Sequence, residues 1–157
     1  DGDEEDSISE ALGAETLPNG DSVFDFLPIE INGRLVWIQH QGAPAGRGIT
    51  EGNALHNYMR NIYFTCLEDK RRLPDVIISG HYHRNVYDTF TRKEHTIHGI
   101  IVPPWQLKTR FGYRVAAAEL DNIGLRVVDI GSPVNGKGAI DVNEPILLQS
   151  RDEVVRI

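Results

Sequence analysis

The segment that most constrains the fold is Asp75–Gly80 (DVIISG), a short and almost continuous apolar run that ends in glycine. A strand that is apolar on both sides is typical of a sheet whose two faces are both covered. The preceding segment, Thr50–Arg72, has apolar residues at three- and four-residue steps, which predicts one long helix that Pro74 ends. Together the two segments predict an α/β (α+β) fold with a mixed β-sheet and one long helix.

Strand-like segments lie on both sides of these two elements. Val23–Ile31 and Arg34–His40 are rich in branched and aromatic residues, and Asn32-Gly33 between them is a strong tight-turn signal. Pro28 in the first arm favours an edge strand or a bulge. Further strands are predicted over residues 86–90 and 96–102, followed by a hairpin of residues 113–120 and 125–130 around a turn at 121–124.

Composition excludes several classes of protein. The net charge of −7 excludes the general attraction to nucleic acid of a basic domain, but not a site where bound cations make the local field positive. Cys66 is the one cysteine, so an intrachain disulfide and a Cys-rich zinc site are excluded. The sequence shows neither an apolar run long enough to span a membrane nor a basic-then-apolar leader. We therefore expect a cytoplasmic location and no membrane partner.

Three segments are expected along the chain. Residues 1–22 carry an acidic cluster on no apolar face, which predicts a flexible N-terminal segment. Residues 23–131 contain the predicted strands and the long helix, in keeping with one domain in a chain of 157 residues. Residues 132–157 are punctuated by Gly and Pro and are expected to form a less ordered C-terminal tail.

Three of the six histidines lie where predicted strands end. His40 closes an apolar strand, and His81 and His83 directly follow Gly80. Because ligands of α/β sheets bind beyond the carboxyl ends of the strands, these imidazoles are candidate ligands of a metal site. In an extended loop, His81 and His83 point the same way at a separation of roughly 6.5–7 Å, which suits two ions about 3.5–4 Å apart better than a single ion. The alternative is a set of loop histidines with ordinary hydrogen bonds.

The other candidate residues have weaker patterns. His56 is expected on the surface of the helix, and His95 and His98 have a spacing that seldom chelates in a hairpin. Arg47 lies in the Gly-rich loop after His40 and is a candidate substrate-binding residue, because a guanidinium group matches phosphate oxygens in bidentate geometry. The alternative for Arg47 is a solvated side chain.

The sequence Gly80-His81-Tyr82-His83, after a buried strand, resembles the GHxH signature of the calcineurin-like metallophosphoesterases. His40 and the Gly-rich loop that follows it resemble the lone metal-binding histidine that precedes GHxH in that family. The resemblance covers residues 23 to about 130 and implies half of a metallophosphoesterase-type α/β sandwich. It implies a hydrolase with a dinuclear metal site, in which His40 and His81 bind one divalent ion and His83 binds the other.

The family's N-terminal motifs, D-x-H, GDxxD and GNH, do not occur at the corresponding places in this sequence. The resemblance therefore implies the C-terminal half of such an enzyme, with the catalytic residues supplied by a missing N-terminal half or by a second chain. Three neutral imidazoles do not offset the charge of two divalent ions, and dinuclear sites normally include carboxylates. We expect the isolated chain to bind metal weakly and to be inactive or nearly so.

Several alternatives stay open at this point. Mn is the favoured metal, with Fe, Zn and Ni as alternatives that affinity order alone does not separate. The substrate is a phosphate ester, and monoesters, diesters, nucleotides and nucleic acid, hence phosphatase and nuclease activities, all remain. The alternative function is a non-catalytic half-domain that acts as a binding or assembly module. A half-sheet exposes strand edges and apolar surface, so a homo-oligomer is a further expectation.

Overall fold

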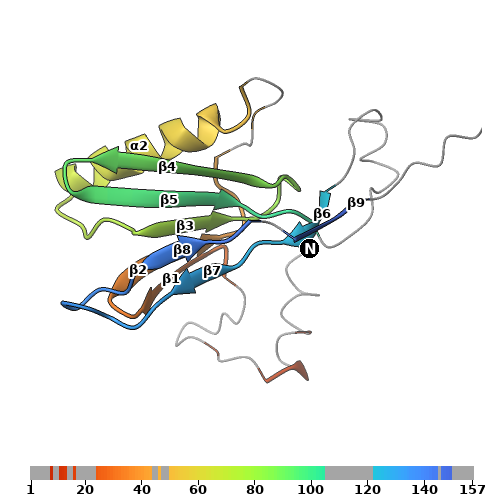
Figure 1. Ribbon diagram of the computed structural model, residues 1–157, viewed down its shortest axis with the longest axis horizontal. Helices are drawn as coiled ribbons and strands as arrows, with labels where there is room; N and C mark the ends of the chain where they lie inside the picture. The colour runs from red at the N-terminus through yellow and green to blue at the C-terminus, as the bar shows by residue number, and fades with distance from the viewer. Residues whose placement is uncertain are drawn as a thin grey trace, which may run out of the picture.

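The computed structural model of the chain describes residues 8, 11–13, 16, 24–43, 46, 50–104, 122–144 and 146–149. Arg47, the predicted hairpin arm at 113–120 and most of the acidic segment 1–22 lie outside these residues. The described residues form a mixed five-stranded sheet with one long helix and two smaller strand pairs (Figure 1). The α/β class predicted from the sequence is therefore confirmed.

The main sheet has the strand order β1-β2-β3-β5-β4. Strands β2, β3 and β5 run parallel, and the outer strands β1 and β4 are antiparallel to their neighbours. The strand bounds are Phe26–Ile31 (β1), Arg34–Gln39 (β2), Val76–Ser79 (β3), Val86–Arg92 (β4) and His95–Ile101 (β5). The apolar segment that predicts a doubly covered strand is thus β3, at the centre of the sheet, and the carboxyl ends of β2 and β3 lie side by side.

The hairpin of β1 and β2 has the tight turn that the Asn32-Gly33 sequence predicts. Asn32 and Gly33 both have positive φ angles, 47° and 76°, as a tight turn of the Asn-Gly type requires. The N–H of His40 donates to the carbonyl of Asp25 at 2.9 Å, so Asp25 and His40 form a hydrogen-bonded pair. Because such pairs alternate along an antiparallel ladder, Pro28 and Trp37 form a pair without hydrogen bonds, and the backbone nitrogen of Pro28 points to the open edge of β1. Pro28 therefore marks an edge strand, as predicted, and disfavours pairing of a further strand with β1.

Helix α2 (Asn53–Glu68) covers one face of the sheet. Its buried side chains, at three- and four-residue spacing, are Leu55, Met59, Tyr63 and Cys66. They pack against the helix-facing side chains of the strands, which are Trp37, Ile77, Val86, Phe90, Ile97 and Ile101. Contact is closest at Gly99, where a Cβ atom would lie 2.6 Å from the sulfur of Met59. The periodicity of the sequence therefore predicts the buried face of this helix correctly.

The helix is shorter than the segment Thr50–Arg72 predicted from the sequence. Lys70 has a φ of 54°, and the N–H of Arg71 donates to the carbonyl of Cys66 at 2.8 Å. The N–H of Lys70 itself donates to the carbonyl of Leu67 at 3.2 Å. These two bonds form a Schellman motif, so a left-handed residue ends the helix before Pro74 is reached.

Replacing Lys70 by glycine should stabilise the protein, because glycine adopts the left-handed conformation without the steric cost that a Cβ atom brings. We expect a gain of about 0.5–1 kcal/mol in the free energy of unfolding, measured by urea denaturation. Lys70→Ala is the control and should bring no such gain, since it removes the charge but keeps the Cβ atom. An equal gain in both variants would contradict the assignment of backbone strain to this position.

A short hairpin covers the other face of the sheet (Figure 1). It consists of β7 (Val128–Ile130) and β8 (Ile140–Val142), which pair in antiparallel register. Its apolar side chains cover the second buried cluster, which comprises Val36, Val76 and Ile100. A separate pair is formed by β6 (Asn122–Leu125) and β9 (Ile146–Gln149). Both faces of β3 are therefore covered, by a helix on one side and by a β-hairpin on the other.

These C-terminal strands differ from the sequence predictions. Residues 121–124 were expected to form a turn, but β6 begins at Asn122 and pairs with β9. Residues 132–157 were expected to form a tail, but β8 lies among them and belongs to the layer that covers the sheet. The Gly- and Pro-rich segment around Asn135 is the loop of the β7–β8 hairpin, closed by a bridge between Val134 and Lys137. The Gly and Pro residues of this segment thus mark a loop between two strands and not the beginning of a C-terminal tail.

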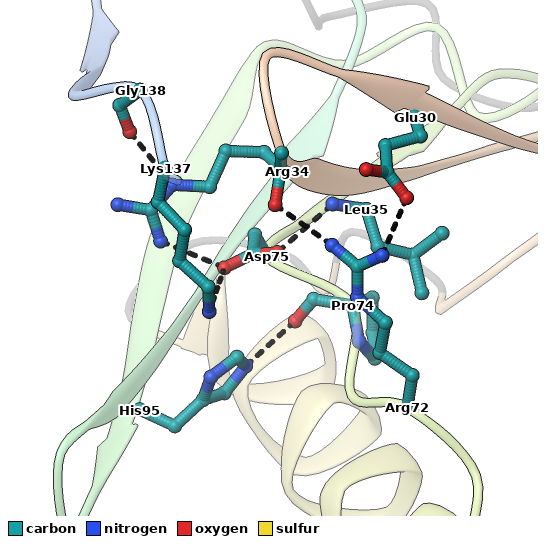
Figure 2. Close-up of polar contacts among 10 residues, drawn as sticks. Glu30, Arg34, Leu35, Arg72, Pro74, Asp75, His95, Lys137 and Gly138 are labelled. Carbon is teal, nitrogen blue, oxygen red and sulfur yellow. Dashed lines mark hydrogen bonds and ion pairs between the residues drawn. The ribbon is translucent and has the colours of Figure 1, made fainter. Parts of the chain in front are cut away.

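A buried carboxylate ties this hairpin loop to the amino-terminal ends of β2 and β3 (Figure 2). Asp75, 1% exposed, accepts hydrogen bonds from a guanidinium nitrogen of Arg34 at 2.8 Å and from the backbone N–H of Leu35 at 2.9 Å. The ammonium group of Lys137 lies 3.8 Å from the same carboxylate, and Arg34 also donates to the carbonyl of Gly138 at 2.7 Å. Asp75 is therefore a structural residue, at the end of β3 opposite to the histidines.

Candidate metal centre

His40 and His81 meet at the carboxyl ends of two neighbouring parallel strands. Gln39 and Ser79 are register partners at the ends of β2 and β3, so the residues that follow them leave the sheet side by side. Nδ1 of His81 lies 3.1 Å from Nε2 of His40, and the two ring centroids are 5.0 Å apart. The predicted proximity of His40 to the loop after β3 is confirmed.

The distance between these two nitrogen atoms suits either of two chemical states. In one, a ring N–H donates to the lone pair of the other ring. In the other, both nitrogens are unprotonated and bind one ion: metal–nitrogen distances of about 2.0–2.1 Å across 3.1 Å give an angle of roughly 100° at the metal. That angle lies between those of octahedral and tetrahedral coordination. Both side chains are exposed, so an ion can reach the pair from solvent.

The loop that carries His81 and His83 is not extended, so the predicted loop geometry is wrong. His81 and His83 have φ angles of 69° and 53°, in the left-handed region that non-glycine residues seldom adopt. The N–H of Tyr82 donates to the carbonyl of Gly80 at 2.8 Å and closes a γ-turn around His81. A positive φ at the centre of such a turn is the rarer and more strained form. Backbone strain of this kind concentrates at binding and catalytic sites.

His83 is exposed and lies two residues beyond His81 in the same loop. Among the described residues, no group of three or more His, Cys, Asp or Glu side chains is placed to hold one metal ion, so His83 does not join His40 and His81 in a single cluster. The sequence resemblance assigns His83 to a second ion, and that assignment stays a prediction. Arg47, the predicted phosphate-binding residue, lies outside the described residues.

Two aspartates near the site in sequence have other partners in the structure. Asp88 on β4 lies 2.9 Å from Nδ1 of His56, which is on the exposed surface of α2 as predicted. Asp75 pairs with Arg34 at the far end of β3. The expectation that neither aspartate would join the three histidines agrees with these pairings.

His95 and His98 lie on β5, three residues apart and so on opposite faces of the strand. His95 Nε2 contacts the carbonyl oxygen of Pro74 at 2.9 Å, and His98 Nδ1 contacts the hydroxyl of Tyr87 at 2.9 Å. Burial lowers the pKa of His98, and the charge of Arg34 lowers it further. His95 and His98 thus have separate hydrogen-bonding partners, in keeping with a spacing that seldom chelates.

Sequence reasoning missed the polar groups directly beneath the histidine pair. Gln39 and Ser79 are buried, hydrogen-bonded to each other and, through Gln39, to Tyr58 of α2. A signal for them exists in the sequence, because each is a polar residue that closes an otherwise apolar strand. Neither residue type indicates by itself whether its side chain points into the structure, so the sequence alone does not predict this hydrogen-bonded pair.

Comparison with known proteins adds no assignment: no protein-family model matches the chain, and no curated protein matches it. In the part of the chain that the structure describes, no helix is long and apolar enough to cross a membrane. The GHxH sequence pattern and the geometry of His40 and His81 are therefore the two observations that bear on function.

Proposed function

We propose that the chain is part of a metal-dependent phosphoesterase of the calcineurin-like type and supplies histidine ligands to its dinuclear metal site. The observation that carries the proposal is the 3.1 Å separation between Nε2 of His40 and Nδ1 of His81, at the ends of adjacent parallel strands. The strained backbone at His81, within the GHxH sequence, supports the same function.

Each histidine has a stated role in this proposal. His40 Nε2 and His81 Nδ1 bind one divalent ion, and His83 binds the second. Bound metal ions activate water as a nucleophile and neutralise charge on the phosphoryl group of a phosphate ester. Mn is the favoured metal and Fe, Zn and Ni are alternatives, because imidazole with oxygen ligands suits all four. Carboxylate ligands and the remaining catalytic groups come from an N-terminal half or a second chain.

Removal of the histidine pair should abolish metal binding. In the metal-free chain, titration with Mn²⁺ or Zn²⁺, followed by calorimetry, should show weak binding that disappears in the His40→Ala, His81→Ala double variant. His56→Ala is the matched control, since His56 is also an exposed histidine with one side-chain partner. It should bind metal as the parent does. Unchanged binding in the double variant would place the metal elsewhere and would remove the basis of the proposal.

A further inference from the structure

A chain of two hydrogen bonds, one buried and one half-buried, joins helix α2 and the ends of β2 and β3 next to His40 and His81. The side-chain amide of Gln39 donates to the hydroxyl oxygen of Ser79 at 2.9 Å, and the hydroxyl of Tyr58 donates to the amide oxygen of Gln39 at 3.0 Å. Gln39 is 8% exposed and Ser79 is 0% exposed. The bridge of Tyr58, Gln39 and Ser79 therefore connects helix α2 to two neighbouring strand ends.

The position of this bridge couples it to the histidines. Gln39 immediately precedes His40, and Ser79 is separated from His81 only by Gly80. The N–H of Gly80 also donates to the carbonyl of Gln39 at 3.1 Å, so the main-chain ladder continues past the ends of the strands. A change in the spacing of Gln39 and Ser79 must therefore move one imidazole relative to the other.

The loop after His40 closes over the same bridge. A Cβ atom at Gly42 would lie 2.3 Å from the side-chain nitrogen of Gln39 and 2.3 Å from the hydroxyl oxygen of Ser79. The hydroxyl of Tyr82, in the γ-turn loop, lies 3.4 Å from the carbonyl oxygen of Gly42. The loops that follow β2 and β3 are thus packed on the bridge or on each other.

Burial of two polar side chains at these strand ends has an energetic consequence. A buried polar group that loses its partner costs about 1–3 kcal/mol, so Gln39 and Ser79 strongly favour the arrangement in which all bonds are made. Apolar residues would fill the same positions without fixing an angle or a distance. Directional hydrogen bonds restrict both.

We infer that Tyr58, Gln39 and Ser79 are positioning residues that hold Nε2 of His40 and Nδ1 of His81 at the separation at which one ion is bound. The effect of these residues on the distance between the two imidazoles in the metal-free protein is independent of the proposed function. Their effect on metal affinity rests on the proposed function. None of the three residues is assigned as a metal ligand in the proposed function.

Two variants test the bridge, and a third is the control. Tyr58→Phe and Ser79→Ala each remove one hydroxyl group from the bridge. Tyr87→Phe removes the hydroxyl that contacts Nδ1 of His98 at 2.9 Å, on the opposite face of the sheet, and so matches the change in Tyr58→Phe. Thermal denaturation shows whether each variant is folded, and Tyr58→Phe, at a half-buried site, keeps the test available if Ser79→Ala does not fold.

The first readout is the nuclear Overhauser effect between the ring protons of His40 and His81 in the metal-free protein, and the second is affinity for Co²⁺ followed by its absorption spectrum. Tyr58→Phe and Ser79→Ala should weaken the Overhauser effect and lower Co²⁺ affinity by about 10–100-fold, as loss of groups that orient metal ligands does. Tyr87→Phe should retain both properties of the parent.

The outcomes separate this inference from the proposed function. If the Overhauser effect depends on the bridge but the parent binds no Co²⁺, the positioning role stands and the phosphoesterase proposal fails. If the parent binds Co²⁺ through His40 and His81 but both bridge variants keep its affinity and its Overhauser effect, the positioning role is overturned. Equal losses in Tyr87→Phe would also overturn it, since they would show a general loss of stability.

Discussion

Asp75→Ala should lower the free energy of unfolding by about 3 kcal/mol, the lower end of the range for removal of one partner from a buried ion pair. The expected loss lies at the lower end of the range because the side chain of Arg34 is 24% exposed and can be hydrated when its partner is removed. The same substitution leaves the backbone N–H of Leu35 without its carboxylate acceptor, which adds to the cost. Urea denaturation at neutral pH measures the difference from the parent.

A matched control is available on the surface. Asp69 and Arg71 form an ion pair at 2.8 Å, with side chains 53% and 54% exposed. Because exposed pairs contribute little, Asp69→Ala should change the free energy of unfolding by less than about 1 kcal/mol. A loss as large as that of Asp75→Ala would show that the charge of the chain, rather than the buried contacts, controls its stability.

The contribution of Asp75 should depend on pH in a defined direction. Burial raises the pKa of Asp75, but the hydrogen bonds from Leu35 and Arg34 and the charge of Lys137 outweigh it, so the pKa is lowered. A carboxyl group with a lowered pKa in the folded state stabilises that state fully above its unfolded pKa of about 3.9, and the contribution is lost as the pH falls through the folded value. The stability difference between parent and Asp75→Asn should therefore be constant near neutral pH and shrink below about pH 4.

The pair of histidines could be predicted from the sequence because two local patterns sufficed. An apolar run such as Val76–Ser79 indicates a central strand, and parallel strands bring their carboxyl ends to the same end of a sheet. His40 and His81 follow such strands, so their proximity required no knowledge of distant contacts. The same reasoning places Asp75 at the other end of β3, away from them.

The conformation of the histidine loop could not be predicted in this way. A γ-turn at His81 depends on the bond from Tyr82 to Gly80 and on the packing of Tyr82 against Gly42, which joins residues 40 positions apart. An L-residue with positive φ is held there by its surroundings and not by its own preference. The sequence therefore indicates which residues form the site, but not the direction in which each imidazole points.

The C-terminal strands were missed for a different reason. β7 and β8 have three residues each, too few for an alternating pattern to distinguish a strand from a loop. Their place is set by contacts with Val36, Val76 and Ile100. It is also set by hydrogen bonds from the side-chain amide of Asn32 to the carbonyls of Ile130 and Gly131, at 2.8 and 3.0 Å. Such long-range contacts leave no periodic signal in a single sequence.

The close approach of the first turn to the β7–β8 loop gives the second prediction with a large effect. Gly33 and Gly136 both have positive φ angles, 76° and 84°, so alanine is strained at either position. A Cβ atom at Gly33 would lie 1.9 Å from the carbonyl oxygen of Gly136, whereas one at Gly136 would meet nothing within 4 Å. The two positions thus share the backbone strain and differ in the steric clash.

Gly33→Ala should therefore cost about 3 kcal/mol or more in the free energy of unfolding, from left-handed backbone strain and overpacking together, and Gly136→Ala only about 1–2 kcal/mol from strain alone. The clash is with a backbone atom, which moves only if the loop moves, and the N–H of Gly138 ties that loop to the carbonyl of Asn32 at 2.8 Å.

Separation of the loop from the turn should lift the β7–β8 hairpin from the sheet and expose Val76 beneath it. Faster amide hydrogen exchange in β7 and β8 of Gly33→Ala, but not of Gly136→Ala, checks this mechanism. Equal exchange and equal stability in the two variants would mean that strain alone acts at both turns, and that the hairpin is held on the sheet by its apolar contacts rather than by the close fit of the two loops.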